Sequence, residues 1–147
     1  MEIKIITENK KQFMDLLLLA DEQEDMIAKY LDRGTLFALY DGDLKSTCVV
    51  TDEGNGEFEL QSLAAYPRYQ RRGYATHLVK HVFAHYAGKG AVMHVGTGDA
   101  PSTVSFYERC GFVFSQRLKD YFLLHYREPM FEEGIQLKDK VYFRKEL

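Results

Sequence analysis

The sequence of 147 residues has little of what several protein classes require. Its two cysteines, Cys48 and Cys110, lie far apart and form no CxxC pair, so they indicate neither a disulfide framework nor a zinc site. We expect both to be small buried side chains in a reducing compartment. With 3 prolines and 11 glycines, the chain is neither collagen-like nor of low complexity.

Long apolar runs and an excess of positive charge are also missing. The longest apolar run, residues 16–20, is too short to cross a bilayer, and charges interrupt the only apolar stretch of the first ten residues, which excludes a signal peptide. A formal net charge of −3 argues against a dedicated nucleic-acid binder. We therefore expect a cytoplasmic protein with no nucleic-acid or membrane partner.

The residues that are present predict a folded domain. Hydrophobic residues make up 46% of the chain, with 10 Tyr and 10 Phe, which is enough for a proper core and excludes a disordered chain. The length fits one domain over residues 1–147, and no repeat or linker divides it.

Hydrophobic periodicity predicts an α/β (α+β) fold in which helices flank a mixed, mostly antiparallel sheet. Helices are expected at residues 13–20 after a cap at Thr7, at about 22–32, at 73–86 and at 101–109, with Gly111 ending the last of them. Strands are expected at residues 2–6, 35–40, 44–51, 58–65, 91–95, 112–116 and 140–145, with a hairpin turn at 41–43.

The most informative segment, residues 67–76, lies between a predicted strand and a predicted helix. Backbone N–H groups at a helix N-terminus lack partners and the helix dipole adds positive potential, so such a turn can bind an anion. Gly73 and Ala75 leave room for a phosphate, and Arg68, Arg71 and Arg72 add positive charge. Neither a Walker A loop nor a GxGxxG fingerprint is present.

A solvated basic turn is the alternative for a lone Arg-Arg-Gly, but three motifs in register favour a ligand site. Over residues 57–114 the sequence resembles the GNAT superfamily of acyl-CoA-dependent N-acyltransferases. The motif Gln/Arg-x-x-Gly-x-Gly/Ala corresponds to residues 70–75, Leu/Ile-Ala-Val-x-Pro to residues 63–67, and Leu-Tyr-x-x-x-Gly-Phe to residues 106–112. The tail, residues 125–136, is similar to a bacterial subgroup of uncharacterised GNAT proteins.

The resemblance implies a GNAT fold, acetyl-CoA as the acyl-donor substrate and no metal. Backbone groups of Leu63, Ala64 and Ala65 would pair with the pantetheine arm, in a gap between two splayed strands. The pyrophosphate would be held by backbone amides of the following turn, from Arg71, Arg72, Gly73, Tyr74, Ala75 and Thr76. Many members place a cofactor-binding Asn where this chain has Asp99 or Ala100; Asp99 could cap the next helix but would not replace that amide.

Two residues are candidates for acid and base chemistry. Glu59 matches the position that some relatives use as general base, and strand alternation puts it with Glu57 and Gln61 on the face opposite Phe58, Leu60 and Ser62. A solvent-facing glutamate is the alternative. Tyr107 resembles the family's tyrosine that protonates the leaving thiolate, and a phenol keeps its proton at pH 7.

Other residues whose types can bind a metal, donate a proton or act as a nucleophile can instead have structural roles. His77, His81 and His85 have a spacing that can bind metal, but surface histidines on a helix are common without one, and the family chemistry needs none. A core position is the alternative for Tyr107. Cys110 directly precedes a capping glycine and has no His or Asp neighbour in sequence, so we do not expect it to be a nucleophile.

We therefore predict an acetyl-CoA-dependent N-acetyltransferase that acts on a small-molecule primary amine by direct transfer in a ternary complex, with an amide near Ala65 stabilising the oxyanion. A non-catalytic acyl-CoA sensor is the alternative. Two acidic segments, residues 21–25 and Glu128, Glu132 and Glu133 of a late loop, favour a cationic acceptor. The resemblance to the family implies a homodimer in which residues 141–143 pair with a partner subunit.

Overall fold

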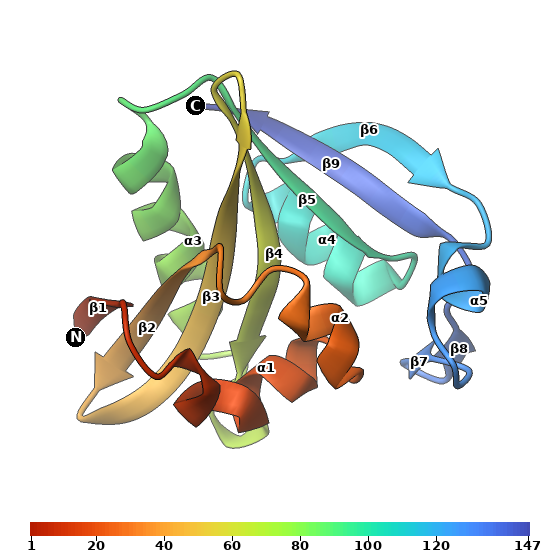
Figure 1. The fold of residues 1–147 in the computed structure, drawn as a ribbon, viewed down its shortest axis with the longest axis horizontal. Coiled ribbons are helices and arrows are strands. Elements are labelled where there is room, and N and C mark those ends of the chain that lie inside the picture. The colour runs from red at the N-terminus through yellow and green to blue at the C-terminus, as the bar shows by residue number, and fades with distance from the viewer.

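The computed structural model describes residues 1–147 as one seven-stranded sheet, a separate two-stranded hairpin, and helices on both faces of the sheet (Figure 1). The sheet has the order β1-β2-β3-β4-β5-β9-β6, with bounds β1 (Glu2–Ile6), β2 (Thr35–Asp41), β3 (Asp43–Gly54), β4 (Glu57–Ala65), β5 (Val92–Gly98), β9 (Lys140–Glu146) and β6 (Val113–Leu118). The helices are α1 (Met14–Ala20), α2 (Glu24–Ala28), α3 (Tyr74–Tyr86), α4 (Pro101–Arg109) and α5 (Tyr121–His125). None of them is long and apolar enough to cross a membrane.

The sheet confirms the mixed, mostly antiparallel fold predicted from the sequence. Only β4 and β5 run parallel, and every other neighbouring pair is antiparallel. The parallel pairing ends at Leu60 and Val95. Beyond that point the two strands diverge, as Figure 1 shows, and the second half of β4 is left without a partner on that edge.

Alternating residues of β2 divide the core between the two faces of the sheet. Phe37 and Leu39 pack with α3 and with Tyr107 of α4 in the larger apolar cluster. Leu36 and Ala38 point the other way and pack with residues of α1 and of the segment around α2. The sheet is therefore covered on both faces, and α1 and α2 lie opposite α3.

Most predicted elements are confirmed, and the errors lie at helix starts and in the tail. Thr7 does not cap a helix: a 3-10 helix, η1 (Lys10–Phe13), precedes α1, and Asn9 occupies its N-cap. The second helix is shorter than expected because helical hydrogen bonding ends in turns well before Gly34. The sequence pattern does not predict α5 or the hairpin of β7 (Phe131–Glu132) and β8 (Ile135–Gln136).

The expectation that residues 141–143 pair with a partner subunit is wrong. These residues belong to β9, which lies inside the sheet and pairs with β5 on one edge and β6 on the other. Each of the three residues pairs with one residue of β5 and one of β6, so neither backbone edge of β9 is free at these positions. The pairing with β6 shifts in register between Phe114 and Gln116. The outer strand on this side of the sheet is β6.

Candidate functional site

The turn before α3 has the backbone geometry of an anion site. Gly73 is the N-cap of α3 and adopts the left-handed conformation with φ of 85°, which a residue with a Cβ rarely adopts. Arg71 is also left-handed, with φ of 64°. Left-handed residues turn successive N–H groups toward one side, and at the start of a 13-residue helix these groups carry positive potential. The turn can therefore bind a phosphate through its backbone.

Side chains that the sequence did not identify hold this turn in place. The Tyr74 hydroxyl donates a hydrogen bond of 2.7 Å to Asp41, and the Tyr69 hydroxyl donates one of 2.8 Å to Asp43. Lys45 lies 3.5 Å from the centre of the Tyr69 ring. The acidic residues on either side of the glycine in the β2–β3 turn are the only sign of these contacts in the sequence, where their local pattern indicates a hairpin turn and no more.

The free edge of β4 presents backbone groups from alternate residues. The N–H of Tyr66 bonds the carbonyl of Lys45 at 3.3 Å, so by alternation Ala64 also directs its backbone groups toward β3. Leu63 and Ala65 then direct theirs away from β3, into the gap beside β5. An unpaired strand edge of this kind can accept an extended chain with amide groups.

A groove of about 730 Å³ joins the turn, the free edge of β4 and helix α4. Its lining includes eight of the nine residues expected to bind the cofactor: Leu63, Ala64, Ala65, Arg71, Gly73, Tyr74, Ala75 and Thr76. The ninth, Arg72, does not line it, and its guanidinium instead lies 5.9 Å from the centre of the Tyr69 ring.

A second cavity of about 350 Å³ meets this groove where β4 and β5 diverge. We call it the acceptor cavity; it lies between the second half of β4, the end of β5, the end of α1 and the tail. Five residues line both the groove and this cavity, and we call their position the junction: Leu19, Leu63, Thr103, Tyr107 and Glu132. Two molecules bound in the two spaces would meet there.

Tyr107 is both a core residue and a lining residue of the site. Its side chain is 8% exposed and packs in the larger apolar cluster, edge-on to Phe112. Burial raises the pKa of its phenol well above the usual range, so the group is fully protonated at neutral pH. Tyr107 is one of the five residues that line both spaces.

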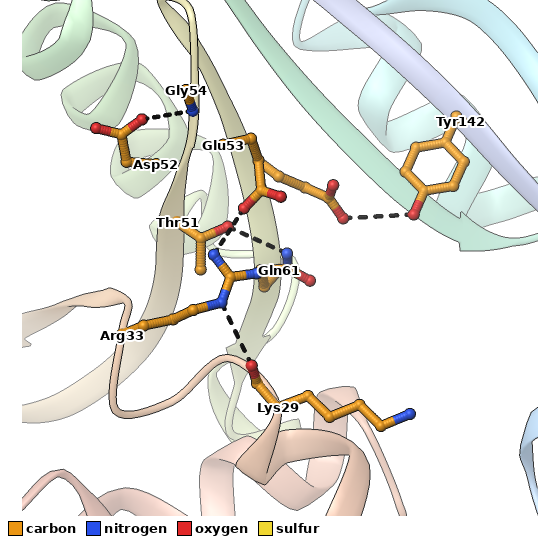
Figure 2. A network of polar contacts seen from close by, with 9 residues as sticks. Lys29, Arg33, Thr51, Asp52, Glu53, Gly54, Gln61 and Tyr142 are labelled. Carbon is orange, nitrogen blue, oxygen red and sulfur yellow. Dashed lines mark hydrogen bonds and ion pairs between the residues drawn. The ribbon is translucent and has the colours of Figure 1, made fainter.

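Glu59 lies on the α1–α2 face of β4 and lines neither the groove nor the acceptor cavity. Its carboxylate accepts a hydrogen bond of 3.4 Å from the Tyr142 hydroxyl (Figure 2). Burial raises the pKa of Glu59, and the nearby Lys140 ammonium partly offsets this effect. Lys140 itself lines the acceptor cavity, whereas Glu59 does not.

The alternation predicted along β4 fails after Leu60. Leu60 pairs with Val50 and Ser62 pairs with the adjacent Val49, so Gln61 is an extra residue in a β-bulge. Gln61 bonds the Thr51 hydroxyl at 3.1 Å, as Figure 2 shows. Ser62 lies near Tyr30, on the α1–α2 side, and not with Phe58 and Leu60 on the α3 side. A bulge of this kind leaves no mark in the hydrophobic pattern.

The tail borders the acceptor cavity and bonds to the link between α1 and α2 and to the first turn of α2. The Tyr126 hydroxyl donates a hydrogen bond of 2.7 Å to Asp21, and Arg127 pairs with Asp25 at 2.8 Å. Glu132 accepts a hydrogen bond from the Thr103 hydroxyl of α4. The two acidic segments therefore do converge, with Asp21, Glu22 and Glu132 in the cavity lining.

Several other candidates take structural roles. No group of three or more His, Cys, Asp and Glu side chains is arranged to hold a metal ion. His81 and His85 contact the ring of Phe37 instead. Asp99 does not cap α4, whose N-cap is Ala100, because its carboxylate pairs with Arg117 at 2.9 Å.

Cys48 is fully buried in the core, as expected, whereas Cys110 is only half-buried. Burial raises the pKa of both thiols, and neither residue lines the groove or the acceptor cavity. A high thiol pKa leaves little thiolate at neutral pH, so neither cysteine has the properties of a nucleophile.

Comparison with known proteins places this geometry in a family. The model of the acetyltransferase (GNAT) family matches residues 5–112. An uncharacterized N-acetyltransferase of Bacillus subtilis, YvbK, is 33% identical over 144 residues, which cover 96% of this chain and 93% of that protein.

Solved structures with the same fold include proteins with CoA or acetyl-CoA bound. A Bacillus subtilis acetyltransferase in complex with CoA superposes with a TM-score of 0.92 at 31% identity, over 99% of this chain and 98% of the other. A GNAT family acetyltransferase from Elizabethkingia anophelis with acetyl-CoA bound superposes with a TM-score of 0.93 at 28% identity, over 99% and 97% of the two chains.

Proposed function

This chain belongs to the GNAT family of acetyltransferases, and on that premise we propose that it transfers the acetyl group of acetyl-CoA directly to a primary amine. The observation that carries the proposal is the junction, where the groove from the α3 turn opens into a second cavity beside Tyr107. Relatives of similar fold with CoA or acetyl-CoA bound support acetyl-CoA as the donor.

The donor would lie in the groove. Backbone amides between Arg71 and Thr76 bind the pyrophosphate at the N-terminus of α3. The pantetheine arm pairs as an added strand with the free edge of β4. The thioester then lies at the junction, where the N–H of Ala65 or a neighbouring residue stabilises the oxyanion.

In the reaction, the neutral amine attacks the thioester carbon, and the tetrahedral intermediate collapses with cleavage of the carbon–sulfur bond. Tyr107 donates its proton to the departing thiolate and recovers one from solvent. The amine proton passes through a water molecule to Glu59, which lies outside the cavity lining. Its raised pKa brings it nearer to that of an amine and makes it a stronger base.

The acceptor is expected to be a small cation. Asp21, Glu22 and Glu132 line the acceptor cavity against a single positive side chain, Lys140. Such an excess of negative charge raises the local concentration of protonated amines and speeds their capture. Of the other acids expected to act in this way, Asp25 pairs with Arg127 and Glu133 accepts a hydrogen bond from the backbone N–H of Ser102. Glu24 and Glu128 do not line the cavity.

The test is release of free thiol from acetyl-CoA in the presence of a panel of primary amines, with mass spectrometry of the products. We expect thiol release that depends on the amine and one acetyl group added to it. Tight binding of acetyl-CoA with no release for any amine would instead favour the acyl-CoA sensor.

A further inference from the structure

The end of the acceptor cavity away from the junction contains polar groups that the proposed reaction does not use. There the cavity continues into a smaller space of about 140 Å³, and five residues line both: Asp21, Gln61, Tyr121, Tyr126 and Lys140. Asp21 is absent from the lining of the donor groove. This end therefore contacts a part of the acceptor that does not react.

Two hydroxyl groups at this end have no hydrogen-bond partner within the protein. They belong to Tyr30 and Ser62, which are each only 5% exposed and which line the small space and the acceptor cavity respectively. The Tyr30 hydroxyl lies near both Ser62 and the carboxylate of Asp21. A buried hydroxyl without a partner is uncommon and costs stability, so a pair of them beside one carboxylate indicates a ligand group.

The buried charges at this end do not cancel. The Lys140 ammonium lies within electrostatic range of two carboxylates, Asp21 in the lining and Glu59, which lines none of the three spaces. It lies 4.6 Å from the centre of the Tyr121 ring and 5.0 Å from that of Tyr142. One negative charge remains when all three groups are ionised. An ammonium group has three N–H donors and one positive charge, and it matches one carboxylate with two free hydroxyl oxygens.

We propose that Asp21, Tyr30 and Ser62 form a subsite for a second ammonium group, so that the acceptor is a short diamine acetylated at its other end. This inference rests on the proposed function and names its substrate class. Ser62 of the subsite directly precedes the junction residue Leu63 on β4, and consecutive Cα atoms are about 3.8 Å apart, so a linker of only a few carbon atoms is needed between the two amines.

The residues beyond the subsite limit the acceptor to two amines. The small space is also lined by Lys29 and Arg33, and their positive charges oppose a third ammonium. Arg33 is partly neutralised by Glu53, with which it pairs at 2.9 Å, whereas Lys29 has no such partner (Figure 2). A longer polyamine would therefore bind no more tightly than a diamine.

The experiment compares kcat/KM for 1,4-diaminobutane, n-butylamine, 4-aminobutanoate and spermidine. We expect the diamine to exceed butylamine by roughly ten- to a hundredfold, the size of a charge-assisted hydrogen-bonded contact, and spermidine to offer no advantage over the diamine. Preference for 4-aminobutanoate would overturn the proposal, because Lys140 would then bind a carboxylate. Equal acetylation of the diamine and butylamine would overturn it too, yet would leave the proposed function intact, whereas no acetylation of any amine would contradict the proposed function itself.

Variants separate the subsite from general effects. Asp21→Asn should reduce the diamine-to-butylamine ratio toward one, whereas Asp32→Asn, at an exposed carboxylate that lines none of the three spaces, should keep the wild-type ratio. Asp21 also accepts the hydrogen bond from the Tyr126 hydroxyl, so its replacement removes a contact of the tail as well. The variants Tyr30→Phe and Ser62→Ala therefore provide a second test. Each removes a hydroxyl without a partner, so the melting temperature should hold or rise while the ratio falls several-fold. An unchanged ratio in all three subsite variants would refute the subsite.

Discussion

The side-chain amide of Gln70 donates a hydrogen bond of 3.1 Å to the backbone carbonyl of Ala65. This contact joins the two parts of the donor groove, because Ala65 ends the free edge of β4 and Gln70 begins the turn that leads to α3. The carbonyl of Ala65 is directed toward the gap and would otherwise lack a partner in the sheet. Gln70 therefore holds the end of β4 against the turn before α3, the two parts of the groove that we propose bind the pantetheine arm and the pyrophosphate.

Replacement of Gln70 tests this coupling. Gln70→Ala removes one neutral hydrogen bond, and we expect acetyl-CoA affinity to fall by roughly three- to tenfold. Gln70→Glu, which places a carboxylate beside a carbonyl oxygen and near the pyrophosphate, should weaken binding further. Calorimetric titration with acetyl-CoA measures both. Gln116→Ala, on the exposed strand β6, is the control, and equal affinities for all variants would show that this contact does not organise the groove.

The turn at Gly73 is the part of the groove on which donor binding depends most. Gly73→Glu introduces a negative charge where the pyrophosphate lies, and the loss of several hydrogen bonds to charged oxygens should weaken acetyl-CoA binding at least roughly a hundredfold. Gly54→Glu is a matched control, because Gly54 has a φ of 86° against 85° for Gly73 and both have open space around the added Cβ. Unchanged affinity in a folded Gly73→Glu protein would exclude this turn as the pyrophosphate site.

Tyr107 should affect turnover much more than donor binding. Tyr107→Phe keeps the ring that packs in the core and removes only the proton donor, so kcat should fall by roughly ten- to a thousandfold with acetyl-CoA affinity nearly intact. Tyr86→Phe, in the same apolar cluster but lining neither the groove nor the acceptor cavity, should retain wild-type kcat. A Tyr107→Phe enzyme with full activity would remove Tyr107 from the mechanism.

The role of Glu59 predicts a pH dependence. Burial raises its pKa, and a base must be ionised, so kcat/KM should rise with pH as the carboxyl loses its proton. Glu59→Gln should slow the reaction by roughly a hundredfold above this pKa and below that of the amine, and less where the amine is already neutral. Profiles over pH 6–9 measure this. If Glu132→Gln changes the profile and Glu59→Gln does not, the proton acceptor is the carboxylate at the junction.

Ionic strength tests the attraction of cationic acceptors. Charges that are exposed to solvent are screened beyond about 10 Å at 0.1 M salt. We therefore expect kcat/KM for a cationic amine to fall between 20 and 300 mM salt, roughly several-fold, and that for a neutral amine to change little. No salt dependence with a basic amine, or preference for neutral amines, would contradict the cationic-acceptor assignment.

The donor side of the site could be predicted from the sequence because it depends on local signals. Gly73 opens an amphipathic helix after a strand, and such a turn is determined by neighbouring residues. The acceptor side could not be predicted in the same way. The Tyr126–Asp21 contact joins residues 105 positions apart, and the bulge at Gln61 reverses the face of Ser62 without changing the hydrophobic pattern. Long-range contacts and bulges are fixed by packing, which no local window contains.

Direct transfer requires that donor and acceptor meet at the junction in one ternary complex. The decisive measurement varies acetyl-CoA and 1,4-diaminobutane together in initial-rate experiments and adds intact-protein mass spectrometry after incubation with acetyl-CoA alone. Direct transfer should give intersecting double-reciprocal lines and protein that carries no stoichiometric acetyl group. Parallel lines together with protein acetylated at Cys110 or another side chain would contradict direct transfer at the junction.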